Sequence, residues 1–329
     1  MKVVLYGSPV IAFLPVLRAR LSPEFNIAAV DYDATDDELE AAFHNAAAVV
    51  TVRYDHRIPD SESIRLVQVP GVGCDEIDRS LLPPEATLCN VYGHGDGVAE
   101  YAMLGMLQFC HQVFEADASF RAGSWSRSSR MQAPPHREMS GSTVGIVGFG
   151  VIGRALAEHL QGFNVTTLVC NRSDPGENAL VEKFYALKDI CAMASDCDFL
   201  IVSVPLVDST IDLIDQDVFA AMKETAVLVN VARGAVVNEY ALYSALHKKE
   251  IGGAVIDVWY NYPSNSDDDH VRPSKYDFAR LENVLMTPHI SGWTEGTVNR
   301  RWTTIVDNLN HLANQRELEN VVYSPEKAV

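Results

Sequence analysis

Short apolar runs rich in β-branched residues recur along the chain and alternate with stretches that carry apolar residues at helical spacing. Continuous apolar runs of this kind are typical of parallel strands that are covered on both faces. The runs are Val3–Tyr6, Ile27–Val30, Ala48–Val52, Leu66–Val69, Thr87–Val91, Thr143–Val147, Val165–Cys170, Phe199–Val204, Ala226–Val231, Ala254–Val258 and Val284–Met286. Eleven strands are more than one doubly wound sheet usually holds, so we expect an α/β protein with two parallel sheets.

Two longer segments are predicted to be helices. One helical run extends from near Val98 to about Ala118. The other, near the end of the chain, has a single apolar stripe with spacings of three and four, formed by Val298, Trp302, Ile305, Val306, Leu309 and Leu312. This last helix follows the final strand of the second domain. We expect it to return to the first domain and so to make that domain discontinuous.

Length and charge narrow the classes of function. The chain has 329 residues, which suggests two domains at roughly 100–200 residues each. It has 26 Lys and Arg against 44 Asp and Glu, a formal net charge of −18. Such a surface repels phosphate backbones and anionic lipids, so nucleic acid and membranes are poor candidates as partners. No apolar run reaches the ~18–20 residues of a membrane span, and Pro9 and Pro15 interrupt the stretch that comes nearest to a signal peptide.

The six cysteines have no CxxC spacing, and most have apolar neighbours. This is typical of buried free thiols in a reducing compartment rather than of disulfides or a metal site. We therefore expect a cytoplasmic protein without a bound metal.

A glycine-rich turn separates the predicted strand Thr143–Val147 from the predicted helix Arg154–Leu160. Its residues form a GxGxxG motif: Gly148, Phe149, Gly150, Val151, Ile152 and Gly153. The first glycine would permit the tight turn, the second would let a pyrophosphate approach the backbone, and the third would let helix and strand pack closely. The helix N-terminus adds amide donors and the positive end of the helix dipole. The motif in this setting predicts a dinucleotide-binding site.

The end of the next strand bears on which dinucleotide binds. An Asp or Glu at this place accepts the ribose 2′-hydroxyl of NAD, whereas this chain has Asn171, Arg172 and Ser173. A guanidinium with amide and hydroxyl donors beside it binds a 2′-phosphate, which a carboxylate would repel. Asp174 follows shortly and could still serve a ribose. We expect NADP as the preferred cofactor, with NAD as the alternative.

A series of short motifs follows the glycine-rich turn in a fixed order. They are Ser195-Asp196, Ser203-Val204-Pro205-Leu206, Thr210, Met222-Lys223, Val229-Asn230-Val231-Ala232-Arg233-Gly234, Asp257-Val258-Trp259 and Thr287-Pro288-His289-Ile290-Ser291-Gly292. Earlier stretches fit the same pattern: Gly71–Asp78, Val98-Ala99-Glu100, and Arg121 with Gly123 and Trp125. Over roughly residues 64–312 the chain resembles the D-isomer-specific 2-hydroxyacid dehydrogenase family, and the combination is far more specific than any single motif.

The resemblance implies two Rossmann-like domains, often assembled as a homodimer, and hydride transfer between a nicotinamide and C2 of a small 2-oxo or 2-hydroxy acid. It implies a substrate-binding domain of residues 1–98 and 291–329 and a dinucleotide-binding domain of residues 99–290. The further residues that it assigns to the cofactor are Val204, Pro205, Thr210, Val231, Ala232, Asp257, Ser291 and Gly292.

The same resemblance assigns the substrate contacts and the catalytic groups. Arg233 would hold the substrate carboxylate and keto oxygen, and His289 would be the acid–base group at that oxygen. The amides of Val72 and Gly73 would bind the carboxylate. Carbonyl reduction builds negative charge on oxygen, which a cation and a proton donor stabilise. Arg suits a planar carboxylate, and a His side chain with its ordinary pKa of ~6.5 supplies a proton near neutral pH.

One position departs from the family pattern. An acidic residue, usually Glu, normally lies five positions after the Asp of the DV motif and pairs with the His, but this chain has Tyr262 there. A carboxylate raises the pKa of a neighbouring His, whereas a neutral phenol contributes no formal charge. We expect His289 to be a poorer acid above neutral pH than in the usual family member, and we count Tyr262 among the substrate-site residues.

The expected activity is that of an NADP-preferring reductase of small 2-oxo acids such as glyoxylate or hydroxypyruvate, and two alternatives stay open. The formate-dehydrogenase branch of the superfamily also lacks the Glu and moves no proton at a carbinol oxygen. That branch has a substrate Asn where this chain has His94, which we count as a candidate substrate contact. The second alternative is a regulator that senses the dinucleotide with little turnover. The sequence does not identify the substrate side chain.

Overall fold

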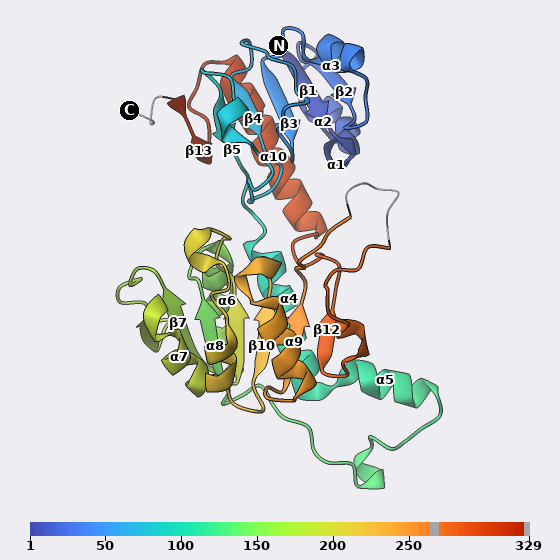
Figure 1. The fold of residues 1–329 in the computed structure, drawn as a ribbon, viewed down its shortest axis with the longest axis vertical. Helices are drawn as coiled ribbons and strands as arrows, with labels where there is room; N and C mark the ends of the chain where they lie inside the picture. Colours follow the sequence, from blue (N-terminus) through green and yellow to red (C-terminus); the bar gives the residue numbers. More distant parts are fainter. Residues whose placement is uncertain (264–269, 326–329) are drawn as a thin grey trace. The chain divides into compact units, whose positions relative to one another are not determined.

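The chain crosses between two α/β units after residue 93 and again after residue 294 (Figure 1). The computed structural model describes residues 1–263 and 270–325. Unit 1 comprises Met1–Gly93 and Glu295–Val329, and unit 2 comprises His94–Thr294. The sequence had placed these crossings at 98/99 and 290/291. In the structure a helix begins directly after each crossing and lies wholly in one unit: α4 (Gly95–His111) in unit 2 and α10 (Glu295–Ala313) in unit 1.

Unit 1 is built on a six-stranded sheet in the order β13-β5-β4-β3-β1-β2. All neighbouring strands are parallel except β13 and β5, which are antiparallel. The strands are β1 (Lys2–Tyr6), β2 (Asn26–Val30), β3 (Ala48–Thr51), β4 (Leu66–Gln68), β5 (Thr87–Cys89) and β13 (Val321–Tyr323). The helices other than α10 are α1 (Ser8–Ile11), α2 (Leu14–Arg20), α3 (Asp36–Phe43) and the 3-10 turn η1 (Arg79–Leu81).

Helix α10 completes the core of unit 1, as its apolar stripe predicts. Trp302 and Ile305 are buried in one cluster with Val3 of β1. The same helix also buries Asn308, whose amide donates to the side-chain oxygen of Gln68 at 2.8 Å. The first α/β unit is therefore discontinuous in sequence.

Unit 2 is built on a seven-stranded parallel sheet in the order β12-β11-β10-β9-β6-β7-β8. The strands are β6 (Thr143–Val147), β7 (Thr166–Asn171), β8 (Lys183–Ala186), β9 (Phe199–Val202), β10 (Val227–Asn230), β11 (Gly253–Ile256) and β12 (Val284–Met286). The helices besides α4 are α5 (Val113–Arg121), α6 (Val151–Leu160), α7 (Ile190–Asp196), α8 (Gln216–Ala221) and α9 (Glu239–His247). The 3-10 turns are η2 (Ser129–Met131), η3 (Gln161–Phe163), η4 (Leu187–Asp189), η5 (Asp208–Thr210), η6 (Gly234–Val236) and η7 (Phe278–Arg280). Across the described ranges of both units, no helix has the length and apolar character that a membrane crossing requires.

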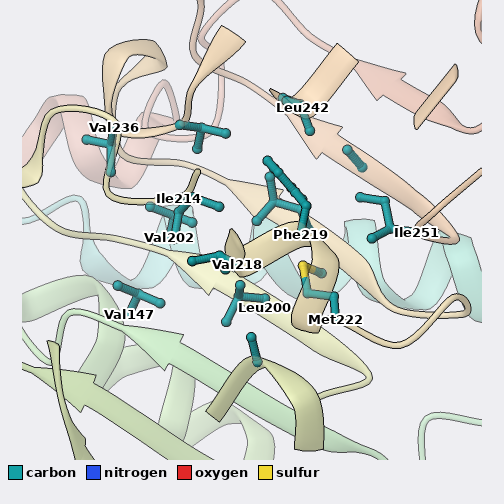
Figure 2. Close-up of a cluster of buried hydrophobic side chains, with 14 of the residues drawn as sticks. Val147, Leu200, Val202, Ile214, Val218, Phe219, Met222, Val236, Leu242 and Ile251 are labelled. Carbon is teal, nitrogen blue, oxygen red and sulfur yellow. The ribbon is translucent and has the colours of Figure 1, made fainter. Parts of the chain in front are cut away.

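The unit 2 sheet is covered on both faces, which explains why its strands are continuous apolar runs. Leu200 and Val202 of β9 point to one face, into a cluster that includes Phe219 of α8 (Figure 2). The alternate residues Phe199 and Ile201 lie in a second cluster with side chains of α4 and α6. Successive side chains of a strand point to opposite faces, so both faces here need apolar residues.

Three local features differ from the sequence expectation. The helical run near 98–118 is broken at Gln112, which adopts a left-handed conformation with φ of 51° between α4 and α5. The side-chain oxygen of Gln108 accepts from the amide of Phe114 at 3.1 Å and so supports the start of the second helix. Strands β8 and β13 were not predicted; both are short and lie at sheet edges.

Residues 113–138, here called the α5 arm, leave the body of unit 2 (Figure 1). The arm carries large apolar side chains that are 50–62% exposed: Val113, Phe114, Phe120, Trp125 and Met131. The rings of Phe120 and Trp125 pack edge to face with centroids 5.1 Å apart. Scattered apolar residues on a surface are ordinary, whereas here several large exposed side chains fall within one short segment.

Candidate active site

The predicted site residues of unit 2 follow the carboxyl ends of its parallel strands. Strand β6 pairs with β7 on one side and with β9 on the other, so the order of the strands reverses beside β6. In open α/β sheets ligands bind outside the carboxyl ends at such a switch point. The glycine-rich turn directly follows β6 and therefore lies where this rule places a ligand.

The glycine-rich turn has the geometry that the motif predicts. Gly148 has φ of +97°, a backbone conformation that residues other than glycine rarely adopt. A Cβ on Gly153 would lie 2.2 Å from the carbonyl oxygen of Gly148, so only glycine lets α6 pack this closely on the turn. A Cβ on Gly150 would meet no atom within 4 Å, which leaves room in front of the first turn of α6. Helix amides facing open space fit a dinucleotide pyrophosphate.

The loop after β9 is shaped by Thr210. Its hydroxyl donates to the carbonyl of Pro205 at 2.7 Å and accepts from the amide of Val207 at 2.9 Å. Ser203 at the start of the loop donates to the carbonyl of Gly148 at 2.9 Å, which ties the loop to the glycine-rich turn. Of the remaining predicted cofactor residues, Phe149, Val204, Val231, Ala232 and Ser291 are buried, Ile152 and Gly292 are partly buried, and Val151 and Pro205 are exposed.

The end of β7 presents Arg172 to solvent. The neighbouring Asn171 donates from its amide to the carbonyl of Ser173 at 3.0 Å, which tightens the turn. The carboxylate of Asp174 accepts from the amide of Gly176 at 2.8 Å. The first acidic group after β7 is thus engaged in its own turn, while the guanidinium stands at the exposed strand end.

Arg233 follows β10 in a turn that Asn230 holds from within. The buried Asn230 side chain accepts from the amide of Ala232 and donates to the carbonyl of Arg233, each at 3.1 Å. A Cβ on Gly234 would lie 2.3 Å from the carbonyl oxygen of Trp259, so the turn packs directly on the segment after β11. The glycine after Arg233 is needed for this close approach, and it places Arg233 next to the Asp257-Val258-Trp259 motif.

His289 lies in a turn that closes around the carboxylate of Asp257. The carboxylate is fully buried and accepts from the hydroxyl of Thr287 at 2.5 Å and from the amides of Ile290 and Ser291 at 2.8 Å each. Between these anchors His289 has φ of 59°, a left-handed conformation. The resemblance assigned Asp257 to the cofactor; in the structure its oxygens bind the turn that carries His289.

Tyr262 lies beside the other members of the site. Its ring centroid is 5.7 Å from that of His289, and its hydroxyl accepts from the amide of Trp259 at 3.0 Å. The indole of Trp259 in turn donates to the carbonyl of Thr287 at 2.8 Å. Burial raises the pKa of the Tyr262 phenol, whereas the Trp259 amide and the positive charge of Arg233 oppose this rise. The position of the usual Glu therefore holds a neutral hydroxyl that lies among Arg233, Trp259 and His289.

The other predicted substrate contacts come from the start of the chain. Val72 and Gly73 are partly buried in the turn after β4 in unit 1, where the carbonyl of Val72 accepts from the side chain of Asn90 at 2.9 Å. His94 is the first residue of unit 2, and its carbonyl accepts from Val98 at the start of α4. Their assignment to substrate stays a prediction.

Sequence reasoning missed several residues that hold the site together. Asn230, Trp259 and Thr287 occurred within the motifs but had no role assigned to them, and Tyr101 was not singled out. Each acts through a backbone atom or another side chain. For Asn230, Trp259 and Thr287 the available signal was their place in the motifs, because a side chain that shapes a turn carries no distinctive chemistry; Tyr101 had no such signal.

Comparison with known proteins identifies the family. Residues 103–291, more than half of the chain, match the family model for the NAD binding domain of D-isomer specific 2-hydroxyacid dehydrogenases. The chain belongs to this family. It is 33% identical over 264 residues to a glyoxylate reductase of Thermococcus kodakarensis, covering 76% of this chain and 74% of that enzyme. It is also 30% identical over 277 residues to a mitochondrial formate dehydrogenase of Solanum tuberosum, covering 80% of this chain and 69% of the relative.

Solved structures agree with this membership. An NADPH-dependent glyoxylate/hydroxypyruvate reductase of Sinorhizobium meliloti in complex with citrate has a TM-score of 0.82 and 26% identity, covering 98% of this chain and 97% of that one. The same reductase in complex with NADP and malonate gives a TM-score of 0.79, covering 98% of this chain and 96% of that one. The family membership makes this protein an NAD(P)-dependent 2-hydroxyacid oxidoreductase that uses a nicotinamide dinucleotide. It confirms the resemblance based on the motifs and the α/β fold inferred from the apolar runs.

Proposed function

We propose that this oxidoreductase is an NADP-preferring reductase of small 2-oxo acids of the glyoxylate or hydroxypyruvate type. The observation that carries the proposal is the convergence of Arg233 and His289 on Tyr262 at the carboxyl edge of the unit 2 sheet. A fixed cation and an imidazole close together are what carbonyl reduction needs, because the reaction builds negative charge on an oxygen that must then take a proton. The similarity to glyoxylate reductases supports the choice of small substrates.

The proposed roles follow from the chemistry of each side chain. A bound nicotinamide dinucleotide supplies the hydride, and the turn from Gly148 to Gly153 would hold its pyrophosphate. Arg233 binds the substrate carboxylate through two parallel N–H donors and stabilises the charge that develops on the keto oxygen. His289 donates a proton to that oxygen. The family resemblance also assigns the amides of Val72 and Gly73, in unit 1, to the substrate carboxylate.

Two further groups complete the proposed substrate site. We count His94 and Tyr262 among the residues that contact the substrate. Asp257, Ser291 and Gly292 belong to the nicotinamide end, where Asp257 acts by holding the His289 turn. The carboxylate of Asp257 already accepts three hydrogen bonds within the chain, so its contribution to the cofactor is secondary to this positioning.

The preference for NADP rests on the exposed end of β7. Arg172 presents a guanidinium beside the Asn171 amide and the Ser173 hydroxyl, and the carboxylate of Asp174 is bound within its own turn. A cation with neutral donors around it favours a 2′-phosphate over a free ribose hydroxyl. The reductase of known structure that resembles this chain was solved with NADP, in agreement with this choice.

A formate-dehydrogenase activity is the second candidate. The neutral residue at position 262 favours it, because oxidation of formate to carbon dioxide requires no proton at a carbinol oxygen. The potato formate dehydrogenase is among the relatives. Arg172 favours the reductase, because its positive charge favours the 2′-phosphate of NADP.

The proposal includes a homodimer in the cytoplasm. The exposed apolar side chains of the α5 arm, among them Phe120 and Trp125, offer a surface for a second copy. All six cysteines are free thiols, and four of them are buried, which suits a reducing compartment. Sedimentation equilibrium of the wild type and of Phe120→Ser tests the dimer: we expect a dimer that dissociates in the variant, and a monomeric wild type would refute this part.

One assay decides among the functions. Purified protein is mixed with NADPH or NADH and a panel of 2-oxo acids, and with NADP or NAD and formate, while absorbance of the reduced nicotinamide is followed. The proposal expects NADPH oxidation with glyoxylate or hydroxypyruvate. Turnover of formate alone would favour the second candidate, and cofactor binding without turnover in any mixture would favour a dinucleotide-sensing regulator.

A further inference from the structure

A chain of hydroxyl groups reaches the active site from helix α4. The Tyr101 oxygen lies 2.5 Å from the Thr287 hydroxyl oxygen, which lies 2.5 Å from one oxygen of the Asp257 carboxylate. A threonine hydroxyl has a single proton, and here the carboxylate, which only accepts, takes it. The Thr287 oxygen must therefore accept from Tyr101. The direction of donation is fixed: Tyr101 to Thr287 to Asp257.

Tyr101 keeps the proton that this chain requires. Burial of the phenol raises the pKa of Tyr101 to about 12, with the charge of Asp257 adding to the rise and the Thr287 hydroxyl opposing it. At neutral pH the phenol is thus a donor. A hydrogen bond that ends on a carboxylate is shorter and stronger than a neutral one, and successive bonds in a chain polarise one another.

The Asp257 carboxylate, at the end of this series of hydrogen bonds, shapes the turn that carries His289. Asp257 binds Thr287 on one side of His289, and the amides of Ile290 and Ser291 on the other. His289 has φ of 59°, and a non-glycine residue keeps such a conformation only when its surroundings impose it. The orientation of the Asp257 carboxylate therefore sets the position of the imidazole, and Tyr101 is the outermost group that fixes this orientation.

We propose that Tyr101 is a positioning residue for proton transfer, acting through Thr287 and Asp257 on the turn that carries His289. The inference rests on the proposed role of His289 as the acid–base group. It assigns to α4, a helix that also packs in the core of unit 2, an indirect influence on the reaction through Thr287 and Asp257. The competing explanation is that Tyr101 only fills space in that core.

The experiment compares variants that each change one hydroxyl-bearing side chain of the Tyr101–Thr287–Asp257 hydrogen-bond series. Tyr101→Phe removes only the first donor, Thr287→Val removes the link, and Thr287→Ser keeps the hydroxyl. Small displacements of catalytic groups cost up to about 100-fold in rate, so we expect Tyr101→Phe to lower kcat by about 10-fold and Thr287→Val by at least as much. Thr287→Ser should stay within about 2-fold of the wild type, and so should the NADPH dissociation constant and the substrate KM of Tyr101→Phe.

A double-variant cycle separates positioning from packing. With Thr287→Val already present, adding Tyr101→Phe should change kcat by less than about 2-fold, because the link is already broken. Tyr185→Phe is the matched control, since the Tyr185 hydroxyl donates to Asp196 at 3.1 Å from the opposite edge of the same sheet. Its kcat should equal that of the wild type. Additive effects in the double variant, or an unchanged kcat in Tyr101→Phe, would overturn the inference.

A second readout is independent of turnover. The imidazole signals of His289, assigned by their loss in His289→Asn, are followed by NMR of histidine-labelled protein through a pH titration. We expect the titration midpoint to move in Tyr101→Phe and not in Tyr185→Phe; an unmoved midpoint would count against the inference. A wild type that reduces no 2-oxo acid would refute the proposed function alone, while this titration would still decide whether Tyr101 controls the His289 turn.

Discussion

Because Tyr262 is neutral where the family usually has Glu, we predict how the reductive rate depends on pH. With His289 as the proposed proton donor, its protonated form is the active one in the reductive direction, so the rate should fall as pH rises through its midpoint. A carboxylate near an imidazole stabilises the protonated ring. We therefore expect Tyr262→Glu to remain active at higher pH than the wild type.

The structure gives the size of the effect. The rings of Tyr262 and His289 are 5.7 Å apart, and Tyr262 is 46% exposed. Opposite unit charges at about this separation attract by about 0.7 kcal/mol in water and about 3 kcal/mol at the effective dielectric of a protein surface. At 1.36 kcal/mol per pH unit the midpoint should rise by about 0.5 to 2 pH units. The exposure of both side chains favours the lower part of this range.

The assay is the initial rate of 2-oxo acid reduction across the acid-to-alkaline range, at saturating cofactor. Tyr262→Gln is the matched control, because it offers a polar acceptor to the amide of Trp259 without a formal charge. The Gln variant should keep the wild-type midpoint. A folded, active Tyr262→Glu with an unmoved midpoint, or an equal displacement in the Gln variant, would refute the reasoning.

Three further predictions test the cofactor and substrate sites. Arg172→Ala should weaken NADPH binding selectively, by ~1.5–3 kcal/mol for a lost charge-assisted hydrogen bond; equal losses for NADPH and NADH in fluorescence titrations would contradict its role. Arg233→Ala should lower kcat/KM by about 100- to 1000-fold with NADPH binding unchanged, and near wild-type kinetics would show that it does not anchor the substrate. Gly153→Ala should cost about 1–3 kcal/mol of unfolding free energy, because its Cβ would lie 2.2 Å from the Gly148 carbonyl. Thermal unfolding should show no such loss for Gly162→Ala, whose Cβ meets nothing within 4 Å.

The sequence predicted the parts of the molecule in which the local pattern matches the fold. Apolar runs such as Phe199–Val202 are buried on both faces, so their pattern alone identifies parallel strands. The glycine motif was equally readable, because Gly148 and Gly153 are each needed for a steric reason. Strands β8 and β13 escaped prediction because β8 begins with the charged Lys183 and β13 has only three residues, so neither forms a distinct apolar run.

The contacts that support the site could not be predicted from the sequence for a different reason. Asp257 and His289 are 32 positions apart, and nothing local indicates that the carboxylate binds the amides on the far side of the histidine. Tyr101 lies still further away along the chain, on another helix. Contacts of this kind are set by the arrangement of strands β11 and β12 and helix α4, which only the folded chain provides.

A carboxylate beside a catalytic histidine can both position the imidazole ring and stabilise its protonated form. In this site the two tasks are separate. Positioning is provided by Asp257, through three hydrogen bonds around the His289 turn, and by the indole of Trp259 on the carbonyl of Thr287. At position 262 the Tyr hydroxyl accepts a hydrogen bond from the Trp259 amide, which a Glu could also do. Unlike Glu, the Tyr side chain brings no negative charge. The departure from the family pattern therefore leaves the geometry of the turn intact and changes only the electrostatics. For this reason we expect Tyr262→Glu to move the pH midpoint without lowering the maximal reductive rate.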